Sequence, residues 1–155
     1  MPDAVLPAAL LQPLLHVMAE QLGGAVILHE APSGRILMVA GAIPGLALED
    51  PIGARPEDYV GRFQVFAQDG SVAHMEALPV VRAIATGEAI TDEVWLIGAE
   101  GRAAPVPVFV DSYPLKDDKG AVIGVIATAT DPKRWGQRAE RMKQSISTRS
   151  RLTGP

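Results

Sequence analysis

Residues 103–130 read AAPVPVFVDSYPLKDDKGAVIGVIATAT and hold two long β-prone runs on either side of one turn. The turn, KDDKG at residues 116–120, combines charged residues with a glycine, which favours a reversal between antiparallel strands. Residues 106–113 place large apolar side chains on both faces, and residues 122–129 are apolar nearly throughout. A sheet with one face in water would alternate apolar with polar residues. The hairpin therefore predicts a sheet that is covered on both faces.

Three further β-prone runs precede this hairpin. Residues 25–29 and 35–40 flank the turn EAPSG, whose glycine suits a positive φ, and they predict an earlier hairpin. Residues 89–97 form the third run and are followed by GAEG at residues 98–101. The chain therefore predicts five strands in an antiparallel sheet.

The stretch between the second and third runs predicts short helices only. Residues 55–61, RPEDYVG, have a proline and two acids where a helix would begin and a glycine where it would end. Residues 75–86 predict a second helix, because Leu78, Val81 and Ala85 share one helical face. Together these patterns predict an α+β domain in which short helices cover one face of the sheet.

The N-terminal segment, residues 1–23, predicts an amphipathic helix that ends at a pair of glycines. Its apolar residues recur at spacings of 4, 3 and 4, and they are Leu11, Leu15, Met18 and Leu22. This stripe would cover the second face of the sheet or meet a second copy of the chain. We expect it to support a homodimer, because burying apolar surface drives association.

A change in charge marks a boundary near residue 131. Residues 1–130 hold 7 Lys and Arg against 16 Asp and Glu, whereas residues 131–155 hold 7 against 2. Residues 132–155 therefore predict a basic C-terminal helix or linker. Its apolar residues have the spacing of a short coiled coil, and they are Trp135, Ala139, Met142 and Ile146. Trp135 is the only aromatic residue in this basic segment, so binding of nucleic acid is not expected.

The composition excludes several classes of site. The chain has 155 residues, 48% of them apolar, and no cysteine. It can bury a core without disulfides, and it offers no thiol nucleophile, no Cys-containing zinc site and no cysteinyl attachment of a flavin or haem. Residues 4–12 form an uncharged, mostly apolar stretch near the start, and they are far fewer than the roughly 20 apolar residues that span a bilayer. Arg35 is the first basic residue, so no secretory n-region is present. We expect a cytoplasmic protein without membrane insertion.

Three stretches in residues 24–131 form a pattern of their own. They are QDG at residues 68–70 leading into EALPVVRAIATGE at residues 76–88, PLKDDKGAVIG at residues 114–124, and Thr130-Asp131 just before the predicted C-terminal helix. In this order and spacing they resemble the PAS sensor domain family. The chain departs from the family in having Pro132-Lys133 after Asp131, where a threonine is common, and in lacking the cysteine of the flavin-photochemical members.

The resemblance implies a sensory and dimerisation module in signal transduction. A small molecule or cofactor would occupy an apolar pocket between the sheet and the short helices. The resulting shift of the sheet would pass through Asp131 into the C-terminal helix at Trp135, and an output signalling domain or partner protein would read it. A second hypothesis stays open: a ligand-free interaction scaffold whose core is filled by its own side chains.

The resemblance, together with alternation along residues 108–112, predicts which residues form the pocket. Those expected to face a common cavity are Leu78, Trp95, Val108, Val110 and Ser112. His74 and Arg82 are the candidate polar contacts at its rim. His74 would ligate a haem or cap a helix at the surface, and Arg82 would clamp a ligand carboxylate or lie on the outer side of its helix. The sequence does not identify the ligand or cofactor further.

No catalytic constellation is present in the sequence. The three histidines, His16, His29 and His74, are not spaced for a local metal pair, and we interpret His16 and His29 as structural or exposed. No serine lies in a Gly-x-Ser-x-Gly elbow, and no glycine-rich phosphate loop precedes a helix. We therefore predict that the chain is not an enzyme.

Overall fold

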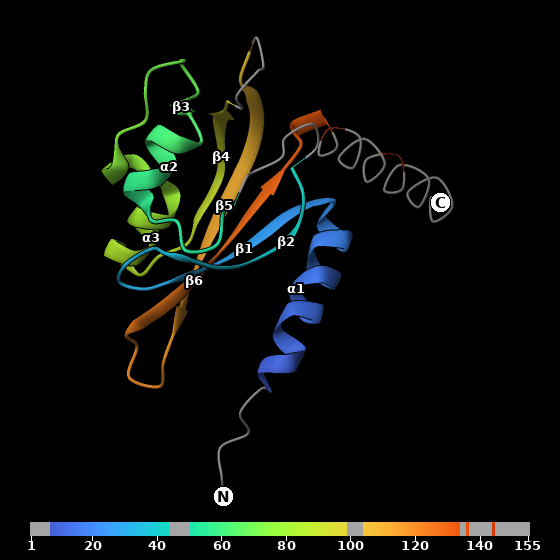
Figure 1. The fold of residues 1–155 in the computed structure, drawn as a ribbon, viewed down its shortest axis with the longest axis vertical. Coiled ribbons are helices and arrows are strands. Elements are labelled where there is room, and N and C mark those ends of the chain that lie inside the picture. The colour runs from blue at the N-terminus through green and yellow to red at the C-terminus, as the bar shows by residue number, and fades with distance from the viewer. Residues whose placement is uncertain (1–6, 44–49, 99–103, 134–135, 137–143, 145–155) are drawn as a thin grey trace, which may run out of the picture.

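The computed structural model describes residues 7–43, 50–98, 104–133, 136 and 144 (Figure 1). Its elements are, in chain order, α1 (Ala8–Leu22), β1 (Gly24–Glu30), β2 (Ile36–Gly41), α2 (Pro56–Arg62), β3 (Val65–Ala67), the 3₁₀ helix η1 (Met75–Ala77), α3 (Pro79–Thr86), β4 (Ile90–Ile97), β5 (Val106–Lys116) and β6 (Val122–Thr130). The predicted α+β class is confirmed.

Within the described residues the strands form one antiparallel sheet in the order β2-β1-β6-β5-β4-β3. The prediction of five strands is wrong by one, because β3 is a sixth strand that pairs with β4. Its three residues are too few to show the alternation by which a strand is recognised in a sequence. The two predicted hairpins, β1–β2 and β5–β6, are both present.

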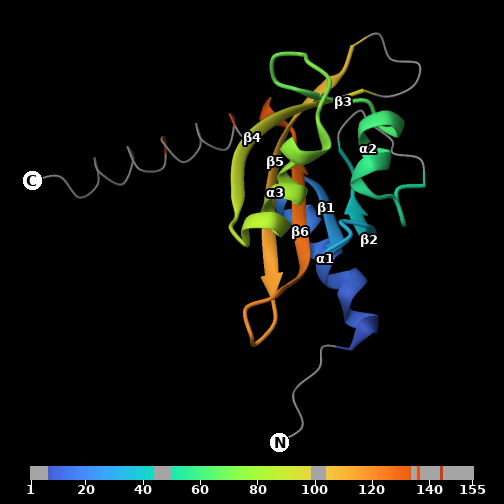
Figure 2. The same ribbon diagram turned by 90° about the vertical axis from the view of Figure 1, so that its left-hand side faces the viewer.

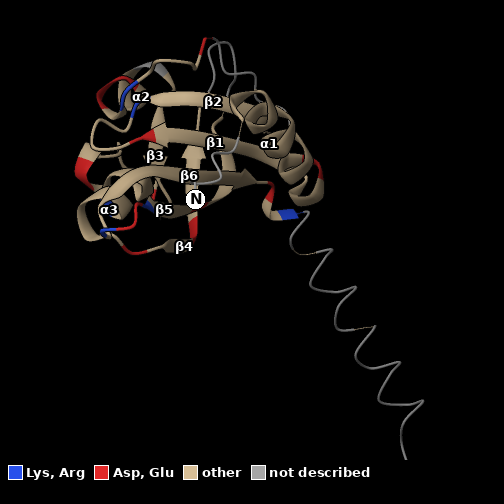
Figure 3. Cartoon of the chain, turned by 90° about the horizontal axis from the view of Figure 1, so that it is seen from below, with Lys and Arg blue, Asp and Glu red and all other residues tan. Residues whose placement is uncertain are grey.

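The sheet separates two layers of helices. The helices α2 and α3 lie on one side, which we call the inner face, and α1 lies on the opposite, outer face (Figures 1 and 2). The short η1 contacts both α2 and α3 on the inner face. A view from below shows α1 beside β1 and β2 on the outer side and α3 beyond the other side of the strands (Figure 3). Both faces are thus covered at least in part, as the apolar strand patterns predict.

The outer layer packs closely. Leu15 and Ala19 of α1 are buried against Val26 of β1 and Ala40 of β2. The N-terminal stripe that we expected to support a homodimer therefore rests mainly on the chain's own sheet. At Gly41, with φ of 73°, an added Cβ would collide with the carbonyl oxygen of Gly24 and would lie 2.7 Å from the Cβ of Ala19. Glycine and alanine thus allow the helix and the strands to approach.

Both edge strands of the sheet contact other parts of the chain. In β2, the backbone N–H of Ile36 donates to the Ala54 carbonyl at 2.9 Å, and the Ile36 carbonyl accepts from the N–H of Gly53 at 2.8 Å. The Val39 carbonyl accepts from Gln12 Nε2 of α1 at 3.1 Å. At the opposite edge, Phe66 of β3 forms an isolated antiparallel bridge with Val72. In both places a neighbouring segment supplies the partner that an edge otherwise lacks.

The chain turns helical directly after β6, at Pro132 and Lys133. Trp135 and the rest of the predicted coiled-coil stripe lie outside the described residues. No helix in the described ranges is both long enough and apolar enough to cross a bilayer.

Candidate functional site

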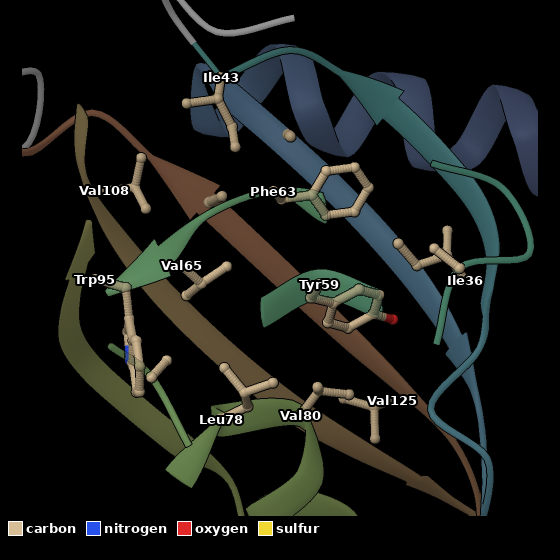
Figure 4. Packing of buried hydrophobic residues seen from close by; sticks show 14 of the residues in the cluster. Ile36, Ile43, Tyr59, Phe63, Val65, Leu78, Val80, Trp95, Val108 and Val125 are labelled. Carbon is tan, nitrogen blue, oxygen red and sulfur yellow. The ribbon is translucent and has the colours of Figure 1, made fainter. Parts of the chain in front are cut away.

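A cavity of about 120 Å³ lies between the inner face of the sheet and the short helices. Its floor comes from β1, β5 and β6, and its walls come from α2, β3, β4 and the start of α3. Tyr59, Val65, Leu78 and Trp95 extend from different elements toward this space (Figure 4). The walls are nearly all hydrocarbon, and no Asp, Glu, Lys or Arg is present among the described residues that line the cavity.

Four of the five residues predicted to face a common cavity line this one: Leu78, Trp95, Val110 and Ser112. Val108 does not line it, although alternation correctly places it on the inner face of β5. It pairs with Trp95 of β4 and is fully buried in the adjoining core. Alternation thus identifies the face of a strand, whereas the position along the strand decides whether a side chain meets the cavity or solid core.

His74 lies outside the cavity. It is exposed and precedes η1 as its N-cap residue, without a side-chain hydrogen bond to that helix. His74 is not among the residues that line this cavity, and its role as a rim contact stays a prediction. The η1 turn separates His74 from Leu78, the first residue of this segment that lines the cavity.

Arg82 also lies outside the cavity lining, because it is bound elsewhere. Its Nη1 and Nη2 atoms donate to the two carboxylate oxygens of Glu93 on β4, at 2.8 and 2.6 Å. The hydrogen bond from Arg82 lowers the pKa of Glu93. The same carboxylate accepts the indole N–H of Trp95 at 3.1 Å, so Glu93 orients a cavity wall. The bidentate geometry expected for a ligand carboxylate is present, but its acceptor is a residue of the chain.

A buried polar cluster that sequence reasoning missed lies at the β1 side of the cavity. Tyr59 Oη donates to the carbonyl oxygen of Gly34 at 2.6 Å, and His29 Nδ1 lies 3.0 Å from the same oxygen and 3.0 Å from Tyr59 Oη. Since a carbonyl oxygen can only accept, Nδ1 carries the ring proton. Both His29 and Tyr59 line the cavity.

This cluster is uncharged at neutral pH. Burial lowers the pKa of His29 to about 4, and the hydrogen bond to Gly34 only partly offsets this effect. Burial likewise raises the pKa of Tyr59. His29 therefore presents a neutral ring whose second nitrogen, Nε2, is a hydrogen-bond acceptor. The hydrogen bonds of this ring to Gly34 and Tyr59 are both made by Nδ1.

Ser112, on β5, is another polar residue of the cavity floor. Its side chain is fully buried, and its Oγ has no hydrogen-bond partner among the described residues. A buried hydroxyl without a partner is uncommon in native proteins and costs free energy. It points to a group that the protein alone does not supply.

Alternation in the sequence contained a signal for His29. It lies two residues after Ile27 on β1, so both share the inner face, and His29 is a polar residue among apolar neighbours there. Interpreting His29 as structural agrees with its hydrogen bonds, but the histidine also belongs to the cavity wall. Tyr59 carried no comparable signal, because its role depends on the packing of α2 over the Gly34 turn.

Asp131, the predicted signal-transfer residue, caps the turn that follows β6. Its Oδ1 accepts the backbone N–H of Lys133 at 2.9 Å. Pro132, which has no N–H to satisfy, occupies the first helical position. The second predicted signal-transfer residue, Trp135, lies outside the described residues.

The described residues do not fit a haem or a flavin. A cavity of about 150 Å³ holds one benzene molecule, and this one, at about 120 Å³, is no larger. A porphyrin or the three fused rings of a flavin need several times that space. His74 does not reach the cavity, and no three His, Cys, Asp or Glu side chains of the described residues are placed to hold a metal ion.

The six-stranded sheet with helices on its inner face has counterparts among solved structures. Over 95% of its length, the chain matches 99% of the dark structure of the blue-light photoreceptor Aureochrome1 LOV, with a TM-score of 0.50 and 11% identity. The chain has a PAS-like fold. That likeness concerns the fold alone, and the cavity of this PAS-like domain lies between its sheet and its short helices.

Two further matches have lower TM-scores. An RNA-binding light-oxygen-voltage receptor matches with a TM-score of 0.49 and 19% identity, and this chain covers 42% of that receptor. The PAS domain of BvgS from Bordetella pertussis matches over 85% of this chain and 96% of that one, with a TM-score of 0.38 and 16% identity. No protein-family model and no curated protein matches the sequence.

Proposed function

We propose that this PAS-like domain is a sensory module that binds a small molecule in the cavity between its sheet and its short helices. The observation that carries the proposal is an apolar cavity with one buried polar atom, Ser112 Oγ, that has no hydrogen-bond partner among the described residues. Ligand sites are typically apolar and concave, with a few polar groups that fix orientation. A core that served packing alone would gain stability from a side chain that filled this space.

The route for the signal is β6. Ala127 and Ala129 of this strand line the cavity floor, and the same strand ends at Thr130, next to Asp131, which caps the following turn. A ligand that contacts the cavity floor differently in two arrangements of the sheet would favour one of them. This change would shift the end of β6. The segment after Asp131 would carry the change to an output domain or partner protein.

We further propose that the module forms a homodimer, through a surface other than the one first expected. Three residues on the solvent side of α1 remain exposed at a helical spacing of 4 and 3: Leu10 (51%), Leu14 (48%) and Val17 (56%). A second copy of the same stripe would cover them. Leu14→Glu should then yield a monomer with unchanged secondary structure, measured by light scattering and circular dichroism.

Native mass spectrometry of the purified full chain tests ligand binding. We expect a bound small molecule whose mass is lost on denaturation. Ala127→Leu, which fills the cavity floor, should abolish that extra mass. Ala121→Leu makes the same change at an exposed position before β6 and should leave it intact.

A ligand-free interaction scaffold is the alternative, and the modest size of the cavity favours it. In that case the parent would have the mass of the bare chain. Ala127→Leu would then stabilise the fold, because it fills empty space without displacing anything. The two functions thus predict opposite results for the parent in one measurement.

A further inference from the structure

The polar atoms of the cavity define what its ligand must carry. Ser112 Oγ is fully buried without a partner in the described structure and can donate or accept. His29 Nδ1 is engaged with Gly34 and Tyr59, which leaves Nε2 as an acceptor only. The proton of Tyr59 Oη is already given to the Gly34 carbonyl. A ligand group that donates or accepts a hydrogen bond can satisfy Ser112 Oγ.

The cavity also excludes charge. Its described lining has no ionic side chain, and burial keeps the His29 ring neutral, since its pKa is lowered to about 4. A carboxylate, phosphate or ammonium group would lose its hydration without gaining a counter-charge, which costs far more than burying a hydroxyl. Anionic and cationic ligands are therefore disfavoured.

The volume limits the ligand to about one ring. At about 120 Å³ the cavity is close to the size that holds benzene. His29 and Ser112 lie on β1 and β5 with β6 between them, so they are two separate polar points on the wall rather than one shared site.

We propose that the cavity selects an uncharged molecule with a single ring or a short branched chain and one hydroxyl group, and that this hydroxyl binds Ser112 Oγ. This inference rests on the proposed function, that the cavity binds a ligand. A hydroxyl satisfies Ser112 in either direction of donation, whereas a hydrocarbon of the same shape leaves the buried serine unsatisfied.

Phenol and toluene are matched probes, because they have the same number of non-hydrogen atoms and phenol has a hydroxyl where toluene has a methyl group. We would measure both dissociation constants by NMR titration of the full chain, for the parent and for Ser112→Ala. The ratio of the toluene to the phenol constant should fall about tenfold in Ser112→Ala, as expected when a buried hydrogen bond is lost. Comparing ratios removes the difference in hydration between the two probes.

Tyr113→Phe is the matched control, because it removes a hydroxyl from the same strand outside the cavity. It should leave the ratio unchanged. Ser112→Ala should also raise the melting temperature of the ligand-free chain, since it removes an unsatisfied buried hydroxyl, and this result shows that the variant folds.

The remaining outcomes distinguish a failure of this inference from a failure of the proposed function on which it rests. An unchanged ratio in Ser112→Ala, or benzoate binding as tightly as phenol, overturns the proposed selectivity and leaves the cavity as a ligand site. If neither phenol nor toluene binds the parent at millimolar concentration, both the selectivity and the ligand site are overturned.

Discussion

The outer and inner faces of one sheet are covered by helices in different ways. On the outer face, a single long helix packs through Leu15 and Ala19, and Gly41 lets a neighbouring strand come close enough that a Cβ there would collide. On the inner face, three short helices bridge the sheet with larger side chains such as Tyr59 and leave a cavity of about 120 Å³.

The contrast shows how one sheet can be packed closely on one face and leave a cavity on the other. Alanine and glycine allow close packing over β1 and β2, where no buried group of the α1 cluster can ionise. The inner layer instead buries a histidine, a tyrosine and a serine around empty space. Substitutions on the outer face should therefore change only the stability of the fold. Substitutions on the inner face should also change how that stability depends on pH or on a bound ligand.

The largest expected effect is on the outer face, for Gly41→Ala. The positive φ and the collision with the Gly24 carbonyl should together cost about 4 kcal/mol of unfolding free energy. Urea unfolding measures it. Gly70→Ala is the control, since Gly70 also has a positive φ but no atom within 4 Å of an added Cβ, so it should cost only about 1–2 kcal/mol. Equal losses in both variants would contradict close packing on the outer face.

The second-largest expected effect is on the inner face, where acidic pH should lower the stability of the fold. The unfolded chain protonates His29 near its ordinary pKa of 6.5, whereas in the folded chain burial lowers that pKa to about 4. The unfolded state then binds more protons, so stability is full above pH 6.5 and is lost as the pH falls toward 4, by roughly 3 kcal/mol.

Unfolding by urea at several pH values between 6.5 and 4.5 measures this loss. His29→Gln keeps a donor for the Gly34 carbonyl but does not titrate, so its stability should be nearly flat in that range. A parent-like slope in this variant would assign the effect to other groups.

The ion pair between α3 and β4 should contribute less. Arg82 and Glu93 are each about one-third exposed, so solvent screens them, and Arg82→Met should cost about 1 kcal/mol. A double-mutant cycle with Glu93→Gln isolates the pair. Because the pair lowers the pKa of Glu93, its contribution should be present above pH 4.5 and lost as the pH falls below it. Zero coupling at neutral pH would show that the ion pair does not contribute to stability.

The smallest and most local effect is expected at Asp131, which directly follows β6. Asp131→Ala removes the acceptor for the Lys133 N–H and should cost about 1 kcal/mol locally. Hydrogen exchange at Lys133 should accelerate, while the affinity of the cavity stays nearly unchanged. Asp131→Asn keeps an acceptor and should exchange almost as the parent does. Identical exchange rates in all three proteins would contradict the proposed link between β6 and the segment that follows Asp131.

The long elements were predictable from the sequence. The turns at residues 30–34 and 116–120 predicted both hairpins, because glycine and charged residues mark reversals between apolar runs. The strand Val65–Ala67 was not, because three residues pair with β4 only once β4 is in place. The stripe through Leu15 showed which side of α1 is apolar, but periodicity does not tell whether the chain's own sheet or a second copy covers it.

The candidate site was predictable in part for the same reason. Spacing placed Val110 and Ser112 on one face of a strand, and both line the cavity. The partner of Arg82 depends on how α3 lies over β4, which no local pattern encodes. His29 has its role through contacts with Gly34 and Tyr59, 5 and 30 residues away in the sequence.

The covered edges of the sheet have a consequence for self-association. Backbone groups of Ile36 and Val39 on β2 are occupied by residues 53–54 and by Gln12, and β3 folds against Val72. Open strand edges are templates on which identical chains join into continuous β-structure and aggregate. Here those templates are blunted at both ends of the sheet. The homodimer proposed above would therefore form through side chains rather than by growing a shared sheet.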